Sequence, residues 1–488
     1  MALTAAGMDL QPSAQQIPVA SNYINNFDFL NQYLPDTYEK EFERYGNRTI
    51  SSFLRMVGAE MPSNSDLIKW TEQGRLHTKY VQVGGVAAVA GADSATVFTV
   101  NDDIVPAGTT ATAGGGIAIR NNQTIMIVWN DGSGSNKAIV SAVDHATSTF
   151  TANYYEATGN AGITTGAGAS DVTIFIYGSE FNKGTAGMDE SLEADDFIFQ
   201  NKPIILKDTY EVSGSDMAQI GWVEVTTENG ASGYLWYLKS EHETRLRFDD
   251  YLETAMIEAV PAEALSGAAD FLQAAPAAGA ANLNGSEGIF YVVGNRGNVW
   301  AGGNPTTLAD FDTVISRLDK QGSIEENVLF VNRGFGFDID DMLAAQNSYG
   351  AGGTSYGLFD NDEDMALNLG FTGFRRGYDF YKSDWKYLND PTMRGDLSTV
   401  AGSGAVNGLL VPAGSTTVYD QILGKNAKRP FLHVRYRASE TEDRRYKSWI
   451  TGSAGGAQTS DVDTMRVNFL SERAVCTLGA NNFVLFNS

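Results

Sequence analysis

Cysteine and histidine are scarce in this sequence of 488 residues, which contains one Cys and four His. The single thiol, Cys476, excludes a disulfide within the chain and any zinc site built from cysteines. Such sparing use of cysteine fits assembly in a reducing cytoplasm. The histidines are far apart and none has an HExxH spacing, so we expect neither a metal centre nor another cofactor.

Long apolar runs are also absent. No stretch approaches the roughly 20 apolar residues that a bilayer requires. Residues 1–21 lack the basic region that precedes the apolar segment of a signal peptide. We therefore expect a soluble protein with no membrane association and no secretion signal.

Positive charge is in short supply. The formal net charge is −25 and the pI is near 4.5, which is the wrong sign for a protein that binds phosphate over a broad surface. This acidity suits a surface that lies close to nucleic acid without adhering to it. By contrast, apolar residues make up 43% of the chain, enough for several cores, and the length predicts two to four domains or one domain with large insertions.

The first half of the chain predicts an arm followed by strands. Residues 1–35 are polar and aperiodic, and two short helices are expected at 36–45 and 49–57. Extended segments at 67–82 and 197–212 then predict the two strands of a long hairpin. Between them, short apolar runs alternate with turn signals from 84 to about 180, which predicts an inserted small β-barrel or sandwich.

A long helix is predicted from about 234 to 260, because this stretch has no Gly or Pro and ends before Pro261. One arc of the helix gathers the apolar residues and His242; these are Leu235, Leu238, His242, Leu246, Phe248, Leu252, Met256 and Ala259. Glu241, Arg245 and Asp249 are spaced by four in the same arc. They form either an ionic ladder at the edge of an intramolecular core or a contact with another subunit.

The second half predicts a mixed α/β domain to about 425, followed by returning strands. We expect strands at 288–295 and 326–332, a helix from Thr307 to Gly322 and a short helix at 338–346. Strands are also expected at 430–438 and 463–486.

Two motifs for chemistry are weak. Gly353, Ser355 and Gly357 match the GxSxG of serine hydrolases, but no strand precedes them and no helix follows, so we favour a loop. Asp360, Asp362 and Asp364 alternate as in a calcium loop, yet Met365 and Phe371 occupy the positions of its glycine and its bidentate glutamate. We interpret this stretch as a solvated acidic turn, with a weak cation site as the alternative. RGFGF at 333–337 is interpreted as a turn.

Two basic segments remain. Arg375, Arg376 and Lys382 alternate with aromatic residues, a pattern that suits stacking on nucleic acid. The alternative is that the aromatic residues pack inside the domain while each Arg pairs with a neighbouring Asp. The segment 425–437 is the most basic of the chain and includes Arg435 and Arg437. Salt bridges to acidic neighbouring chains explain it as well as DNA contact does.

The order of these parts resembles the Hong Kong 97-like major capsid protein of tailed phages. The residues that carry the resemblance are the hairpin flanks DLIKWTEQGRLHTKYV and FIFQNKPIILKDTYEV, the helix GYLWYLKSEHETRLRFDDYLETAMIEAV, the pair FDTVISRLDKQG and NVLFVNRGFG, and the closing FLSERAVCTLGANNFVLF. They span most of the chain as soft patterns. The sequence is also similar to capsid proteins of crAss-like phages.

The resemblance implies an α+β fold with an extended N-terminal arm, a long β-hairpin (E-loop) carrying an inserted small β-domain, a spine helix and an axial α/β domain. The implied boundaries are 1–65 for the arm, 66–83 and 181–215 for the hairpin, 84–180 for the insertion, 216–275 and 426–488 for the peripheral domain with spine helix 234–260, and 276–425 for the axial domain.

The implied function is self-assembly in the host cytoplasm into hexamers and pentamers of an icosahedral virion shell. Portal and auxiliary or decoration proteins would be partners, and double-stranded DNA would be enclosed without sequence-specific binding. No catalytic residue is expected. The candidate contacts between subunits are Glu241, Arg245, Asp249, Arg375, Arg376, Arg435 and Arg437. Two alternatives stay open: a phage tail or tube protein, and a β-rich surface enzyme or adhesin that uses the loop around Ser355.

Overall fold

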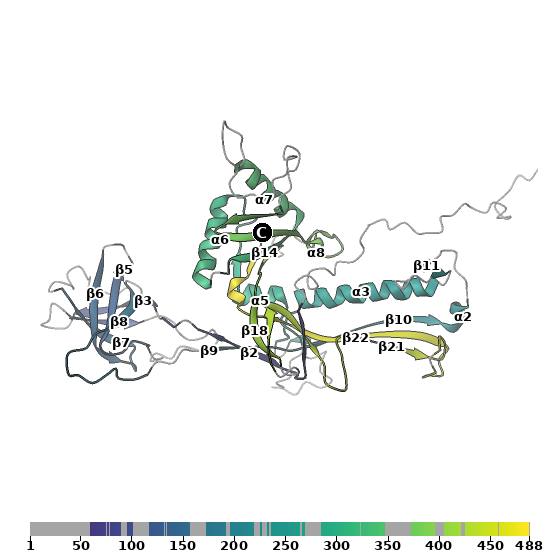
Figure 1. Ribbon diagram of the computed structural model, residues 1–488, viewed down its shortest axis with the longest axis horizontal. Coiled ribbons are helices and arrows are strands. Elements are labelled where there is room, and N and C mark those ends of the chain that lie inside the picture. The colour runs from purple at the N-terminus through teal and green to yellow at the C-terminus, as the bar shows by residue number, and fades with distance from the viewer. Residues whose placement is uncertain are drawn as a thin grey trace, which may run out of the picture.

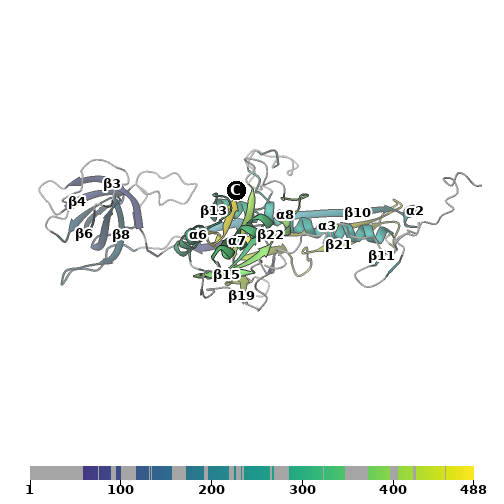
Figure 2. The ribbon, with the colours of Figure 1, turned by 90° about the horizontal axis from the view of Figure 1, so that it is seen from above.

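The computed structural model describes residues 59–74, 76–77, 79–88, 95–100, 117–130, 132, 134–156, 172–191, 196–218, 225–226, 232–233, 236–263, 266–268, 285–322, 324–346, 372–395, 405–420, 425–456 and 458–487. These residues form a mixed α+β structure that is long in one direction (Figure 1). A barrel lies at one end, a limb of strands and one long helix lies at the other, and an α/β unit stands between them. Figure 2 shows the same order from above.

The limb and the middle of the molecule share a five-stranded sheet. Its longest strand is β22 (Thr464–Thr477). Its neighbours are β10 (Ile204–Ser213), β21 (Lys447–Gly452), β20 (Leu432–Arg437) and, beyond β20, β1 (Glu60–Ser63). β1 is parallel to β20, and the other pairs are antiparallel.

The helix α3 (Trp236–Glu258) packs on this sheet and, at 1.5 Å per residue, is about 35 Å long. Phe248 is fully buried between the two, with its ring centroid 5.8 Å from that of Phe469 and 5.5 Å from that of Tyr446. Leu252, Val212 and Val467 complete this core. Three short elements lie between β10 and α3: α2 (Gly214–Met217), β11 (Val225–Thr226) and β12 (Ser232–Gly233).

The α/β unit contains a six-stranded sheet whose order is β13-β23-β17-β14-β16-β15. These strands are β13 (Asn298–Trp300), β14 (Glu326–Val331), β15 (Gly373–Arg376), β16 (Tyr378–Asp384), β17 (Val406–Pro412) and β23 (Val484–Asn487). The helical segments of this part are α5 (Ile289–Arg296), α6 (Leu308–Gln321), α7 (Arg333–Gln346), α8 (Lys386–Asn389) and the 3-10 turn η2 (Ala480–Asn482). A separate hairpin joins β18 (Ser415–Asp420) to β19 (Lys425–Pro430).

The α/β unit and the limb are packed into one body. The last turns of α3 supply Met256 and Ile257 to a core that also contains Ile289 of α5, Leu409 of β17 and Val475 of β22. A single hydrophobic core therefore crosses the junction, so this end of α3 is fixed relative to both sheets.

A two-stranded ribbon leaves the body toward the barrel. β2 (Ile68–Gln73) pairs antiparallel with β9 (Asp196–Asn201), and the structure shows no third strand beside them among the described residues. The strands are opposed from Ile68 and Asn201 at the body to Gln73 and Asp196 at the outer end.

The barrel at the end of the ribbon is closed, with the strand order β3-β4-β7-β6-β5-β8. Its strands are β3 (Lys79–Ala88), β4 (Ala95–Val100), β5 (Gln123–Trp129), β6 (Ser135–Asp144), β7 (Thr149–Tyr154) and β8 (Val172–Ser179). Inward-facing residues alternate with outward-facing ones, and the interior includes Phe98 stacked on Phe150 at 5.4 Å. The barrel thus has a hydrophobic core of its own.

The strand pairing differs from the single long hairpin predicted over 67–82 and 197–212. Only β2 and β9 form the ribbon, because the chain from Lys79 enters the barrel and β10 pairs with β22 over ten residue positions. Pairing with β22 gives β10 a core on one face through Val212, which a free hairpin lacks. In the same sheets, β23 belongs to the α/β sheet and β1 extends the sheet of β20.

Two local predictions are wrong, and one is confirmed. Residues 288–295 were expected to be a strand but form α5, because a short apolar run does not distinguish a strand from a buried helix. RGFGF was interpreted as a turn but begins α7, where the Asn332 side chain accepts a hydrogen bond from Phe335 N at 2.8 Å and caps the helix. The helix after Thr307 is confirmed, with a capping box between Thr307 and Asp310.

Replacing Phe248 by Ala is expected to lower the free energy of unfolding of the body by about 3–5 kcal/mol, because the fully buried ring leaves a cavity between α3 and the sheet. Chemical denaturation followed by tryptophan fluorescence measures the loss. The control is Tyr251→Ala on the same helix, where the exposed ring predicts a change within about 1 kcal/mol. Equal losses in the two variants would contradict the role of Phe248.

Candidate functional site

The residues predicted from the sequence as subunit contacts lie on three elements: α3, β15 and β20. β15 belongs to the six-stranded sheet and β20 to the five-stranded one. They do not form one site.

The ladder on α3 lies at the rim between the helix and its own sheet. Burial raises the pKa of the Tyr446 hydroxyl to about 12; the negative charge of Asp249 adds to the rise and Arg245 opposes it. Both residues therefore face Tyr446, whose ring packs on Phe248. Arg245 is itself exposed, while Glu241 and Asp249 are half-buried.

The two arginines of β15 have acidic partners within the chain. Arg375 Nε lies 3.2 Å from Asp379 Oδ1, and Arg376 pairs with Asp312 of α6. The Arg376 guanidinium holds the pKa of the Asp312 carboxyl below its usual value. The aromatic neighbours of these arginines point inward: Phe374 stacks on Phe380 at 5.1 Å. Two interpretations of this segment were open from the sequence: stacking on nucleic acid, or ion pairs within the chain with aromatic residues packed inside the domain. The observed contacts of Arg375 and Arg376 are those of the second interpretation.

On β20, Arg437 Nη1 lies 2.5 Å from Asp66 Oδ1, just before β2. This ion pair ties the start of the ribbon to the five-stranded sheet. Arg435, two residues earlier, is half-buried. It lies beside the buried His433, whose pKa it helps to lower.

The base of the ribbon is held by residues that the sequence analysis did not select. The Arg296 guanidinium of α5 lies 4.5 Å from the ring centroid of Phe199 and 6.0 Å from that of Trp70, and Arg296 Nη2 lies 2.7 Å from Glu287 Oε2. A cation over two rings from opposite strands fixes the angle at which the ribbon leaves the body.

Asn201 also anchors the ribbon and is almost fully buried. Its Nδ2 donates to Val475 O at 2.7 Å and to Glu287 O at 3.0 Å. Its Oδ1 accepts from Glu287 N at 2.8 Å, from Lys202 N at 2.8 Å and from Ser286 Oγ at 3.0 Å. The amide therefore has partners for both of its polar atoms, as a buried Asn requires.

Beyond this base, the strands carry apolar side chains into solvent. Ile198 on β9 is 67% exposed and Phe197 beside it is 41% exposed. The sequence signal that could have revealed them is that β9 has apolar residues on both faces, which a strand with one solvated face does not need. An apolar surface on a projecting strand favours a contact with another molecule.

The described residues do not indicate a metal site. They contain no group of three or more His, Cys, Asp or Glu side chains placed to hold a metal ion. Within the same part of the chain, no helix combines the length and the apolar character needed to cross a bilayer. The loop around Ser355 and the acidic turn of Asp360, Asp362 and Asp364 lie outside the described residues.

Comparison with known proteins gives partial structural likenesses. No family model matches the chain, and no curated protein sequence matches it. The capsid structure of the cyanophage P-SCSP1u is similar at 8% identity and a TM-score of 0.33, covering 78% of this chain and 91% of that one.

Two further structures are similar over less of this chain. The asymmetric unit of the mature capsid of bacteriophage PhiM1 matches at 12% identity with a TM-score of 0.32, covering 63% of this chain and 78% of that one. The holo-SrpI encapsulin complex from Synechococcus elongatus PCC 7942 matches at 9% identity with a TM-score of 0.31, covering 62% and 77%. At these TM-scores the matches describe a partial likeness in backbone course.

His433 predicts a pH dependence of stability. Burial lowers its pKa to about 4, so between the ordinary value of 6.5 and 4 the unfolded chain binds a proton that the folded chain does not. Stability should therefore fall as the pH drops through this window, with a slope approaching about 1.4 kcal/mol per pH unit.

The measurement is chemical denaturation at several pH values between 7 and 4.5 for the wild type and for His433→Asn, which keeps a donor for Pro430 O. The variant should lose this part of the slope. An unchanged slope would show that other groups carry the acid sensitivity.

Proposed function

We propose that this chain is a structural protein whose copies assemble into a closed shell: the major capsid protein of a tailed bacteriophage, possessing the Hong Kong 97-like architecture and belonging with crAss-like phages. Copies would form the hexamers and pentamers of an icosahedral virion capsid that encloses double-stranded DNA. In this proposal the chain is not an enzyme and has no cofactor.

The observation that carries the proposal is the β2–β9 ribbon. A two-stranded ribbon is marginally stable at best in water, and three or more strands or a covering helix are needed for stability. Here the ribbon is held to the body by Arg296, by Asn201 and, near its outer end, by Glu72, whose Oε1 accepts a hydrogen bond from Gly479 N at 2.9 Å, while Ile198 on the opposite face remains 67% exposed. A ribbon held on one face, with an exposed isoleucine on the other, is suited to lie on the surface of a neighbouring copy, where that apolar area leaves water.

Charge and shape support the same assembly. A net charge of −25 keeps the interior surface of a shell from adhering to DNA. Because the molecule extends in opposite directions from the α/β unit (Figure 1), each copy can touch several neighbours. In the proposed arrangement α3 is the spine helix, the α/β unit is the axial domain and the ribbon is the E-loop. The barrel is the part that auxiliary or decoration proteins would bind. The portal protein is a further proposed partner.

The ionic residues selected from the sequence have unequal roles in this proposal. Three of them, Arg375, Arg376 and Arg437, already form ion pairs within the chain. In the proposal they contact a neighbouring copy while these ion pairs stay formed. Glu241, Arg245, Asp249 and Arg435 are the remaining proposed contacts.

The first test replaces Ile198 by Asp. Placing a carboxylate in a buried apolar contact should reduce the yield of closed shells at least tenfold, which corresponds to about 1.4 kcal/mol or more per contact. The melting temperature of the unassembled chain should change little, because Ile198 is exposed there. Shell yield is measured by negative-stain electron microscopy and sedimentation of the purified chain with its assembly factors.

Gln200→Asp is the matched control, since Gln200 is an exposed polar residue on the same strand and the same face. It adds the same charge without removing apolar area and should leave shells intact. Normal shells from Ile198→Asp would refute the ribbon contact. A wild-type chain that stays monomeric under all conditions would refute shell assembly, and open tubes would point to a tail or tube protein.

The second test addresses α3. Arg245→Glu is expected to weaken assembly more than it lowers the stability of the unassembled chain, because Arg245 is exposed at the rim of the helix. The control is Arg247→Glu, which breaks the 3.2 Å ion pair with Asp208 and should cost less than about 1 kcal/mol. Equal losses of assembly and stability in Arg245→Glu would assign this residue to the intramolecular core.

A further inference from the structure

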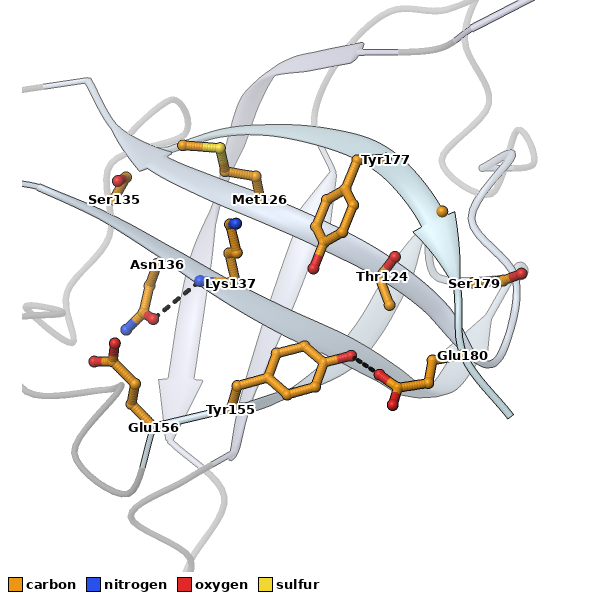
Figure 3. A pocket seen from close by; sticks show the side chains of 11 residues that line it. Thr124, Met126, Ser135, Asn136, Lys137, Tyr155, Glu156, Tyr177, Ser179 and Glu180 are labelled. Atoms are coloured by element: carbon orange, nitrogen blue, oxygen red, sulfur yellow. Dashed lines mark hydrogen bonds between the residues drawn. The ribbon is translucent and has the colours of Figure 1, made fainter. Parts of the chain in front are cut away.

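The barrel carries an open pocket of about 730 Å³ on its outer surface, formed by β5, β6, β8 and the residues that follow β7 (Figure 3). The alternation of the strands separates this pocket from the barrel core. Ile125 and Ile127 of β5 are fully buried inside, whereas Thr124 and Met126 line the pocket. The pocket is therefore a surface feature that the barrel does not need for its own packing.

A β-bulge shapes one wall of the pocket. In the β5–β8 ladder, Thr124 is opposite Gly178 and Ile125 is opposite Ile176, so Tyr177 between them has no partner on β5. Bulges of this kind re-aim a side chain and are frequent beside binding sites. Gly178 has no side chain to fill the pocket beside Thr124. A Cβ at this position would lie 3.2 Å from Thr124 Oγ1.

Two tyrosines flank the pocket and are about half exposed: Tyr155 at 51% and Tyr177 at 47%. Both are held in place. The Tyr155 hydroxyl donates to Glu180 Oε2 at 2.5 Å. The Lys137 Nζ lies 5.6 Å from the ring centroid of Tyr177, and Phe175 meets that ring edge-on at 6.5 Å. Rings that are fixed in advance lose little conformational entropy when a ligand stacks on them.

The charges of the pocket exclude an anionic ligand. The lining contains one cation, Lys137, and two carboxylates, Glu156 and Glu180, and the whole chain has a net charge of −25. Phosphate groups and nucleic acid require the opposite balance. The remaining polar groups of the lining are hydroxyls and an amide, including those of Thr124 and Asn136, which both donate and accept hydrogen bonds.

We infer that this pocket binds a neutral oligosaccharide. A sugar ring has one face of C–H groups, which stacks on a tyrosine ring, and a rim of hydroxyls, which bond to carboxylates, amides and hydroxyls. Tyr177, whose side chain is oriented by the β-bulge, supplies the stacking surface. Tyr155 and its hydrogen-bond partner Glu180 line the opposite side of the pocket. This binding is separate from shell assembly, because it depends on the barrel surface and not on the ribbon.

The test uses the full-length unassembled chain on an immobilised panel of neutral, sialylated and sulfated oligosaccharides. Titration calorimetry with the best neutral glycan then measures affinity. Tyr177→Ala should weaken binding about tenfold, because an aromatic stacking contact is worth up to that factor. Tyr177→Phe keeps the ring and should stay within about threefold.

Two controls separate this ligand class from others. Tyr381→Ala removes an exposed tyrosine from the α/β unit and should leave glycan binding unchanged. Glu180→Gln keeps a hydrogen-bond acceptor for Tyr155, so a neutral sugar should tolerate it, whereas a cationic ligand would lose affinity. Thermal unfolding of each variant checks that the barrel is folded.

The inference is supported if a neutral glycan binds and its affinity is insensitive to salt. The affinity should also fall in Tyr177→Ala and be retained in Tyr177→Phe. It is overturned if the folded chain binds none of the neutral glycans at millimolar concentration. It is also overturned if only charged glycans bind, or if Tyr155→Ala and Tyr177→Ala together leave affinity unchanged.

Discussion

The strand β22 is the element on which the rest of the structure depends. Its first half is paired on both edges, by β10 and β21, and carries α3 on one face, while its second half is buried almost continuously and pairs with β20. The chain then passes through η2 into β23 of the other sheet. One continuous segment therefore supports the limb and leads into the α/β unit, so a change of register in β22 would displace both.

Contacts with this strand position the ribbon. Asn201 donates to the backbone of Val475 in β22, and Ile68 packs against Ala474 and Cys476 of the same strand. Arg296 holds the same face of the ribbon through the rings of Trp70 and Phe199. The direction of the ribbon is thus set by the rigid body, and among the described residues Ile198 on its outer part remains 67% exposed.

The sequence predicted the parts whose signals are local. The helix after Thr307 has its capping residues within four positions, and the long helix is marked by its composition and by Pro261. The alternating runs between 84 and 180 signalled a β-rich unit, since each strand of a small barrel needs one apolar face. The choice between barrel and sandwich was not local, because it depends on β3 meeting β8 ninety residues later.

The features that were missed depend on distant partners. The ring contacts of Arg296 join positions 70, 199 and 296, and the hydrogen bonds of Asn201 reach 286, 287 and 475. No periodicity relates such positions. The arginines of β15 were selected for their charge, yet Asp312 and Asp379 neutralise them once the fold is formed.

The chain enters and leaves the barrel on adjacent strands. β3 begins at Lys79, which is opposite Phe175 of β8, so the two ends of the insertion lie side by side while the ribbon closes behind them. A foreign domain whose termini are similarly close could replace the barrel without a change in the body. The outer end of the ribbon is therefore a suitable point at which to graft another domain onto the body.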